Sequence, residues 1–261
     1  MNIPASIKRR IGFRKANLDK LGCSEAQVLL FDDMVLKIEP DNPGADNEHR
    51  MMRWLQGRLP VPQILEEACV DGVRYLLMSR MPGANLCDEA ILDDQERLAG
   101  LVAEGLHRLW DVDIGGCPTD RTLEQKLHEV EARLRQGLVT VGNASQKDTY
   151  GPGGFSSPAH LFDWLVKHSP PEEKVLSHGD YCLPNIFFDA HGLTGYIDLG
   201  DAGVADRWVD IEKAVWSMWA NTTGQFGGKR RDFDRQLLFD ALGMPCDHEK
   251  LRFYGLLSEL F

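Results

Sequence analysis

Short apolar runs, separated by polar and turn-forming residues, occur in the first third of the chain and are typical of β-strands. Residues 26–38 (AQVLLFDDMVLKI) predict two short strands joined by a turn at the two aspartates. Residues 72–81 (GVRYLLMSRM) predict another strand. This part of the chain is therefore expected to form a small sheet.

A helical period separates these predicted strands. Glu48, Met52, Leu55 and Leu59 fall at i, i+4, i+7 and i+11, which places a carboxylate on the apolar face of a helix. Burying an ionised carboxylate is costly unless a cation pairs with it. We therefore expect Glu48 to pair with a lysine on a neighbouring strand, and Lys37 is the natural candidate.

The rest of the chain is mainly helical in its pattern. Apolar stripes of helical spacing run through residues 98–109 and 123–138, and Ser157-Pro158 predicts the start of a further helix. A strand-rich beginning followed by helices predicts two unequal lobes. We place them at residues 1–80 and 81–261.

Polar residues gather at 178–185 (HGDYCLPN), directly before an apolar run. Pro184 disfavours the α conformation at the preceding residue, which predicts a loop there. Residues 186–188 then predict a strand, and a turn at 190–193 predicts a hairpin that pairs Phe188 with Gly195. In that register Asn185 lies opposite the aspartate of "YIDLG", Asp198.

Such a hairpin would bring two oxygen ligands together at its open end. Asn185 and Asp198 could then share one Mg²⁺, with Asp180 beside them on the same loop. One aspartate that orients a hydroxyl, together with two metal ligands, is the arrangement that phosphoryl transfer requires in a kinase. The alternative is that His178, Asp180 and Asn185 are ordinary polar residues that cap a loop.

Composition narrows the class of partner. The chain has 261 residues, of which 43% are hydrophobic and 26% charged, and a formal net charge of −11. This balance is typical of a globular protein, disfavours nucleic acid, and favours a cationic or small neutral partner. No apolar run could cross a bilayer and the first residues lack a signal-peptide core, so we expect a cytoplasmic protein without membrane association. The six cysteines form no C-x-x-C pair, which indicates reduced thiols.

Several motifs together resemble one enzyme family. "SHGDYCLPNIFFD", "GYIDLGDAGVADRWVDI", "NEHRMMRWLQGRLPVP" and the ending "LLSELF" are similar to the aminoglycoside 3'-phosphotransferases (kanamycin kinases), which modify antibiotics in bacteria. The resemblance covers nearly the whole chain. It implies an α+β, protein-kinase-like two-lobed fold, with a small β-rich N-lobe containing one helix and a larger, mainly helical C-lobe. It also implies ATP or GTP as phosphate donor, Mg²⁺, an aminoglycoside acceptor, antibiotic resistance, and a monomer or weak homodimer.

The resemblance assigns a role to each residue of the phosphoryl-transfer site. Asp180 matches the catalytic aspartate, which also contacts the acceptor hydroxyl. Asn185 and Asp198 match the magnesium ligands. Lys37 matches the lysine that binds the α- and β-phosphates, with Glu48 as its helix partner.

Further roles concern the nucleotide and the loop that carries Asp180. Ser24 matches the contact to the β-phosphate, while Met78, Ser79 and Met81 match the hinge that binds adenine. Asp210 matches the aspartate that braces the catalytic loop, although the cap of a helix N-terminus explains it nearly as well.

The acceptor site follows the family less closely. Glu259 and the terminal carboxylate of Phe261 match groups that meet the ammonium groups of aminoglycosides. Asp201 stands where many relatives have arginine, and Ala220-Asn221 falls where at least one relative has an acidic pair. Fewer carboxylates would narrow the range of accepted drugs, because each charge-assisted hydrogen bond contributes about 1.5 to 3 kcal/mol.

We therefore predict an ATP-dependent phosphotransferase that acts on aminoglycosides, at the 3'-hydroxyl. One alternative is a kinase of the same fold for another small alcohol, such as a macrolide or a sugar amine. A second alternative is a nucleotide-binding module without turnover.

Overall fold

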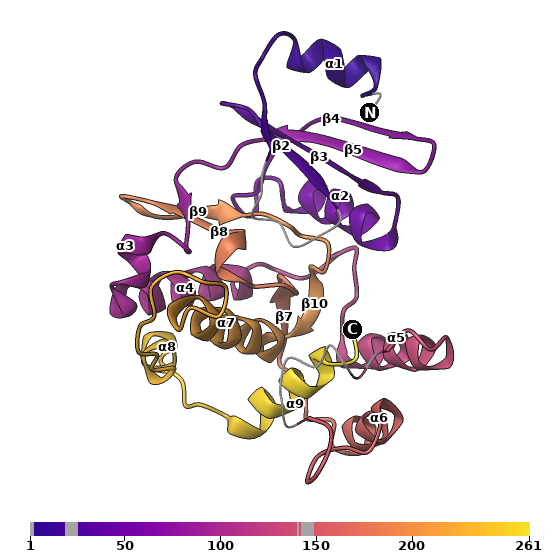
Figure 1. Cartoon of the computed structure of the whole chain (residues 1–261), viewed down its shortest axis with the longest axis vertical. Coiled ribbons are helices and arrows are strands. Elements are labelled where there is room, and N and C mark those ends of the chain that lie inside the picture. The colour runs from indigo at the N-terminus through magenta and orange to yellow at the C-terminus, as the bar shows by residue number, and fades with distance from the viewer. Residues whose placement is uncertain (1–2, 19–25, 140, 142–148) are drawn as a thin grey trace.

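The computed structural model describes residues 3–18, 26–139, 141 and 149–261. They form a small lobe built on an antiparallel sheet and a larger, mainly helical lobe, as Figure 1 shows. The small lobe contains a five-stranded sheet in the order β1-β2-β3-β5-β4. Its elements are α1 (Ala5–Ile11), β1 (Asn17–Leu18), β2 (Gln27–Leu30), β3 (Met34–Pro40), α2 (Pro43–Leu55), β4 (Ile64–Val70) and β5 (Val73–Ser79).

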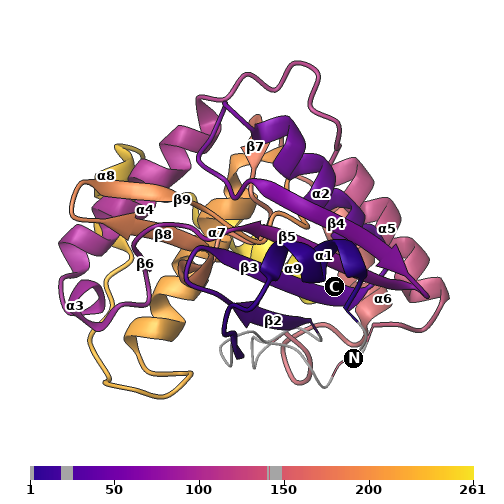
Figure 2. The ribbon, with the colours of Figure 1, turned by 90° about the horizontal axis from the view of Figure 1, so that it is seen from above.

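The two faces of this sheet bury different sets of side chains. Successive residues of a strand point to opposite faces. On β5, Tyr75 and Leu77 join a core with Ile7 and Ile11 of α1, whereas Leu76 joins the main core of the molecule. Figure 2, which looks down on the small lobe, shows α1 lying across the sheet.

Helix α2 belongs to both lobes. It begins with Asn42, whose side chain accepts a hydrogen bond from the main-chain N–H of Ala45 at 2.9 Å. Its apolar residues Met51, Met52 and Leu55 are buried in the same core as the helices of the large lobe. This helix is therefore fixed to the large lobe by its packing as well as to the sheet.

The large lobe is arranged around α4 and α7. Helix α8 packs against α4, α9 packs against α7, and α5 and α6 form a pair beside α9 (Figure 1). Two short sheets, β6-β8-β9 and β10-β7, lie between these helices and the small lobe. The elements are β6 (Ala84–Asn85), α3 (Glu89–Leu92), α4 (Gln95–Trp110), α5 (Leu123–Arg135), α6 (Pro158–Lys167), β7 (Lys174–Ser177), β8 (Ile186–Asp189), β9 (Gly192–Tyr196), β10 (Gly203–Asp206), α7 (Arg207–Thr222), α8 (Gln236–Leu242) and α9 (His248–Ser258).

The predicted hairpin at 186–198 forms, but its predicted register is wrong by one residue. Phe187, not Phe188, pairs with Gly195, and a bulge at Thr194 takes up the extra residue. Thr194 Oγ1 donates a hydrogen bond to the Pro82 carbonyl oxygen at 2.8 Å, which gives the bulged residue a partner outside the hairpin. The turn is correspondingly shorter, because Asp189 pairs with Gly192.

The loop before this hairpin also differs in one respect from the prediction. Residues Leu183–Asn185 form a single 3₁₀ turn that starts just before Pro184. The main-chain oxygen of Asn185 accepts a hydrogen bond from Ile197 at 3.0 Å, so Asn185 lies opposite Ile197 and Asp198 follows one residue later.

Other elements follow the sequence pattern closely. Ser157 caps α6 by accepting a hydrogen bond from the His160 N–H at 3.1 Å.

In the part of the chain that the structure describes, no helix is both long enough and apolar enough to span a bilayer.

Candidate active site

Lys37 and Glu48 form the ion pair that their spacing predicts. Lys37 lies on β3, Glu48 on α2, and the Lys37 Nζ is 2.7 Å from Glu48 Oε2. Glu48 is only 1% exposed, so its carboxylate depends on this partner. Burial lowers the pKa of the Lys37 ammonium, but Glu48, Asp198 and Glu39 together raise that pKa well above its ordinary value. Lys37 therefore stays charged.

Asp198 connects this pair to the large lobe. Its Oδ1 lies 3.0 Å from Lys37 Nζ, although the two residues are far apart in the sequence. Asp198 has a positive φ of 61°, which is uncommon for a residue other than glycine. The side chain is about half exposed and so remains open to a second partner.

Helix α7 holds the loop that contains Asp180. Asp210, in its first turn, accepts hydrogen bonds from the main-chain N–H groups of His178 (2.8 Å) and Gly179 (2.9 Å). The helix cap is a different residue, Asp206, whose side chain accepts from Trp208. Of the two explanations for Asp210, the structure therefore supports the brace.

His178 fixes the loop from the other side. It is fully buried, and its Nε2 contacts the Ile197 carbonyl oxygen at 2.9 Å, so this nitrogen carries the proton. Nδ1 then accepts the Asp180 N–H at 3.4 Å. A buried histidine with both nitrogens occupied in this way has a structural role.

Gly179 lets two loops approach each other at their backbones. Its φ is +81°, and a Cβ atom at this position would lie 2.2 Å from the main-chain oxygen of Asp201. Only glycine satisfies both conditions. This constraint could not be read from the sequence, because it arises from residues that are distant in the chain.

The Asp180 carboxylate is hydrogen-bonded at both oxygens. Asn185 Nδ2 donates to Asp180 Oδ2 at 3.1 Å and also to the Asp180 main-chain oxygen at 3.0 Å. The Cys182 thiol donates to Oδ1 at 3.2 Å. Burial, followed by the charge of Asp180, raises the pKa of this thiol, so it remains a donor. These bonds fix the direction of the carboxylate.

Asn185 and Asp198 offer oxygen atoms suited to a hard cation. Because Nδ2 of Asn185 is bonded to Asp180, its Oδ1 is the atom that could bind a metal. Among the described residues, no group of three or more His, Cys, Asp or Glu side chains could hold a metal ion on its own. A site with one carboxylate and one amide suits Mg²⁺, which usually takes its remaining ligands from water and substrate phosphates.

The residues predicted to contact the nucleotide base lie along the end of β5 and just beyond it. Met78 is buried and lies opposite Val35 of β3. Ser79 Oγ accepts a hydrogen bond from the Gln63 N–H at 2.9 Å, and Met81 packs against Gly195. Ser24 lies outside the described residues.

Two of the predicted acceptor contacts, Asp201 and Phe261, have basic residues beside them. Asp201 lies 3.5 Å from Arg121, so it already has a cation beside it. Phe261 is about half exposed, and its main-chain oxygen, part of the terminal carboxylate, accepts a hydrogen bond from Arg133 Nη2 at 3.0 Å. Its ring lies 5.3 Å from Lys126 Nζ. Glu259 follows the last turn of α9.

Glu212, on α7, is a further acidic residue near Glu259 that no sequence motif indicated. Burial raises its pKa to about 7, with a contribution from Glu259 and against the opposing effect of Lys213. Its position near α9 could not be read from the local pattern, because it depends on how α7 and α9 pack.

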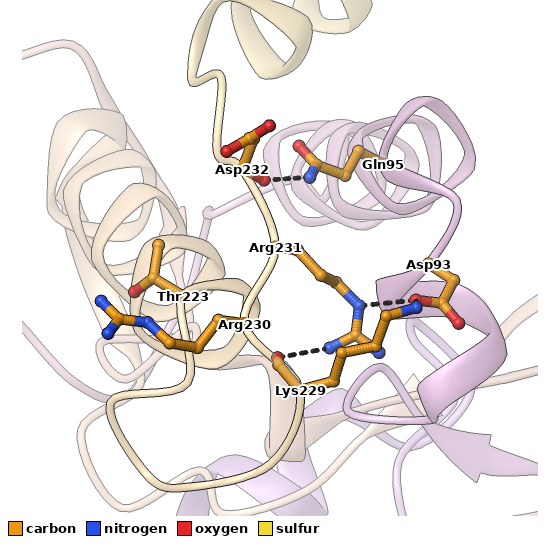
Figure 3. A pocket seen from close by; sticks show the side chains of 7 residues that line it. All are labelled: Asp93, Gln95, Thr223, Lys229, Arg230, Arg231 and Asp232. Carbon is orange, nitrogen blue, oxygen red and sulfur yellow. Dashed lines mark hydrogen bonds and ion pairs between the residues drawn. The ribbon is translucent and has the colours of Figure 1, made fainter.

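One surface cavity of about 510 Å³ lies elsewhere on the large lobe (Figure 3). Lys229 Nζ and Arg231 Nε both contact Asp93 Oδ1, at 2.6 and 2.7 Å, and Arg231 also contacts Glu89. These ion pairs fasten the segment between α7 and α8 to α3. None of the predicted site residues lines this cavity.

Comparison with known proteins shows a family match and full-length relatives. The model of the phosphotransferase enzyme family matches residues 20–253. An aminoglycoside 3'-phosphotransferase of Enterococcus faecalis is 34% identical over 100% of this chain and 99% of its own length. One from Niallia circulans is 36% identical over 100% of this chain and 98% of its own.

Solved structures share the fold at lower sequence identity. A crystal structure of an aminoglycoside 3'-phosphotransferase of type VIII superposes with a TM-score of 0.77 at 22% identity, over 98% of this chain and 97% of the other. An aminoglycoside phosphotransferase of Streptomyces rimosus in complex with ADP and streptomycin has a TM-score of 0.74 at 21% identity, over 97% and 95% of the two chains.

Proposed function

Since the chain belongs to the phosphotransferase enzyme family and matches aminoglycoside 3'-phosphotransferases along their whole length, we propose that it phosphorylates aminoglycoside antibiotics at the 3'-hydroxyl. The phosphate donor is ATP, and the reaction confers resistance on the cell. The proposal includes a cytoplasmic location, where ATP is available. The observation that best supports phosphoryl transfer is the contact of Lys37 with both Glu48 and Asp198.

Asp180 is the proposed catalytic residue. In this reaction the acceptor hydroxyl oxygen forms a bond to the γ-phosphorus, the bond from that phosphorus to the β–γ bridging oxygen breaks, and ADP leaves. Asp180 orients the hydroxyl and accepts its proton. Asn185 and Cys182 support this role because they fix the direction of the carboxylate.

Lys37 and Asp198 are the proposed contacts for the phosphates and their counter-ion. Lys37 binds the α- and β-phosphates, and Glu48 holds its ammonium in place. Asn185 and Asp198 would hold Mg²⁺, which would neutralise phosphate charge when bound. Ser24, Met78, Ser79 and Met81 complete the proposed nucleotide site.

The acceptor is held by negative charge in this proposal. Glu259, Phe261 and Asp201 are the proposed contacts to its ammonium groups, together with Asp180 at the reacting hydroxyl. The overall charge of −11 supports a polycationic acceptor.

A matched pair of acceptors tests the position of transfer. Kanamycin B carries a 3'-hydroxyl and tobramycin is its 3'-deoxy counterpart, so labelled phosphate from ATP should appear on the first and not on the second. Asp180→Asn keeps the shape of the side chain but weakens its ability to accept a proton. We expect kcat to fall by about 10²- to 10⁴-fold. ADP affinity, measured as a control, should stay close to that of the unmodified protein.

The same assay separates the alternatives. Labelling of a macrolide in place of kanamycin B would indicate a kinase for another small alcohol. Nucleotide binding without labelling of any acceptor would indicate a module without turnover, and equal activity in Asp180→Asn would refute the assignment of Asp180.

A further inference from the structure

Asn47 joins helix α2 to the loop that follows Asp198. It is only 3% exposed, and its Nδ2 donates to the main-chain oxygens of Gly200 at 2.9 Å and Ala202 at 2.8 Å. Its Oδ1 accepts a hydrogen bond from Thr119 Oγ1 at 2.6 Å. One side chain of the small lobe therefore binds two separate segments of the large lobe.

The position of Asn47 beside Glu48 makes this contact relevant to the site. Neighbouring residues of a helix point about 100° apart. Helix α2 can therefore direct Glu48 towards Lys37 and Asn47 towards the loop at 200–202. That loop begins two residues after Asp198, which itself contacts Lys37.

The other contacts of this loop come mainly from the large lobe: Leu199 and Ala202 are buried in the main core, and Asp201 lies beside Arg121. The Ala202 N–H donates to the Leu199 carbonyl oxygen at 3.1 Å, and Arg121 Nη2 donates to the Gly200 carbonyl oxygen at 3.1 Å. Asn47 alone, among the described residues, is seen to bond both Gly200 and Ala202 from the other lobe.

We propose that Asn47 is a positioning residue that sets the distance between the Lys37–Glu48 pair and Asp198. It does so by holding α2 on the loop at 200–202. The two halves of the nucleotide-phosphate site are thereby in place before the ligand arrives. This inference rests on the proposed function, which identifies the site as a nucleotide-phosphate site. Its test measures nucleotide binding and needs no aminoglycoside.

The chemistry of the amide explains why asparagine stands at this position. Its two N–H groups meet two carbonyl oxygens, and its oxygen meets a hydroxyl, so each group has a suitable partner. Aspartate has nearly the same shape but would turn a carboxylate oxygen towards the two carbonyl oxygens. Asn47→Asp therefore replaces two favourable hydrogen bonds with repulsion, and because the position is buried, urea unfolding must show that the variant is folded.

The test measures nucleotide affinity with and without magnesium. For the unmodified protein we expect fluorescently labelled ADP to bind more tightly when Mg²⁺ is added. In Asn47→Asp this magnesium-dependent gain should shrink by about tenfold, because the loop loses both hydrogen bonds that Asn47 donates to it. Affinity without Mg²⁺ should change by less than about threefold. A simple loss of stability would not separate the two affinities in this way.

Two further variants make the result decisive. Arg50→Ala, at an exposed position on the same helix, serves as the matched control and should bind like the unmodified protein. Thr119→Val removes only the hydroxyl donor, from a residue outside any helix or strand, and should reduce the magnesium-dependent gain by about threefold.

The outcomes distinguish this inference from the proposed function. If Asn47→Asp is folded and keeps the full magnesium-dependent gain in ADP affinity, Asn47 is not a positioning residue. If Asn47→Asp does not fold, a full gain in Thr119→Val would refute the role of Asn47 instead. If the variants lose the gain but the unmodified protein phosphorylates no aminoglycoside, the role of Asn47 stands and the proposed function fails.

Discussion

Gly179 shows how a single residue limits what this site tolerates. Its positive φ and its distance from Asp201 are two separate restrictions, one on the backbone and one on space. Gly116 shares the first restriction, with a φ of +73°, but has no atom within 4 Å of the position that its Cβ would occupy. The two glycines therefore allow the restrictions to be measured separately.

Alanine substitutions at these positions should have different consequences. Gly116→Ala should lower the free energy of unfolding by about 1 kcal/mol, the usual cost of a positive φ. Gly179→Ala must also move the loop that holds Asp180, so we expect a loss of about 3 kcal/mol or more and little activity. Urea unfolding and kanamycin B phosphorylation would check both. Similar losses in the two variants would show that the close approach to Asp201 does not matter.

At the scale of residues, the sequence predicted a contact between two neighbouring elements whose burial pattern requires it. The Lys37–Glu48 pair is an example, because a carboxylate on an apolar stripe requires a cation nearby. Asn47 was not predicted, since its partners come from distant segments of the chain. The ion pair between Asp201 and Arg121 was not predicted for the same reason.

Helix α7 supports the loop that contains Asp180 along one side. Asp210 binds the start of that loop, and Ser217 Oγ accepts the Leu183 N–H at 2.9 Å near its end. Glu212 lies between them in the sequence and is electrostatically coupled to Glu259 near the end of α9. The helix thus supports the loop through Asp210 and Ser217, and it also contains an acidic residue whose pKa is raised by burial.

Glu212 should make stability depend on pH. Its pKa is raised from an ordinary 4.5 to about 7, so the folded protein binds an extra proton between these values. The free energy of unfolding should therefore fall as pH rises from about 4.5 to about 7, because Glu212 must lose its proton in the folded protein. Glu212→Gln removes this loss, and we expect it to be more stable than the unmodified protein by about 1 to 3 kcal/mol at pH 8, with a smaller difference at pH 5.

Urea unfolding at both pH values would measure this effect. The exposed Glu124→Gln is a suitable control and should change stability by less than about 0.5 kcal/mol at either pH. A gain for Glu212→Gln that is the same at both pH values would contradict the raised pKa.

At the scale of elements, the sequence predicted most long helices and the central strands, because their periods are clear. The short α1 and the strand β4 were not predicted. Helix α1 has only seven residues and two buried apolar positions, and β4 lies at the edge of the sheet with a mixed pattern of burial. The hairpin register was wrong because a bulge leaves no mark in a period of two.

At the scale of the molecule, the two lobes were predicted from the change of pattern along the chain. The sequence could not show that α2 shares its core with the large lobe, because its apolar stripe does not say which neighbour it faces. The boundary at residue 80 stays a prediction. The acceptor region was also hard to predict, since Glu259, Asp201 and Glu212 come from different elements.

The charge of the whole molecule should affect binding of the acceptor more than binding of ATP. A net charge of −11 attracts a polycation over a distance that salt shortens. We expect the KM for kanamycin B to rise several-fold between about 50 and about 500 mM NaCl. The KM for ATP, an anion, should stay constant or fall. Sucrose at equal osmolality is the control, and an unchanged KM for kanamycin B would argue against long-range attraction.

Lys37 faces three carboxylates, and its ammonium donates hydrogen bonds to two of them, Glu48 and Asp198. Under the proposed roles, an incoming triphosphate must compete with Asp198 for this one positive charge. Asp198 would then need a new cation, which a metal-loaded nucleotide brings with it. A bare nucleotide would leave one negative group without compensation, so these proposed roles would favour a nucleotide that arrives together with its counter-ion.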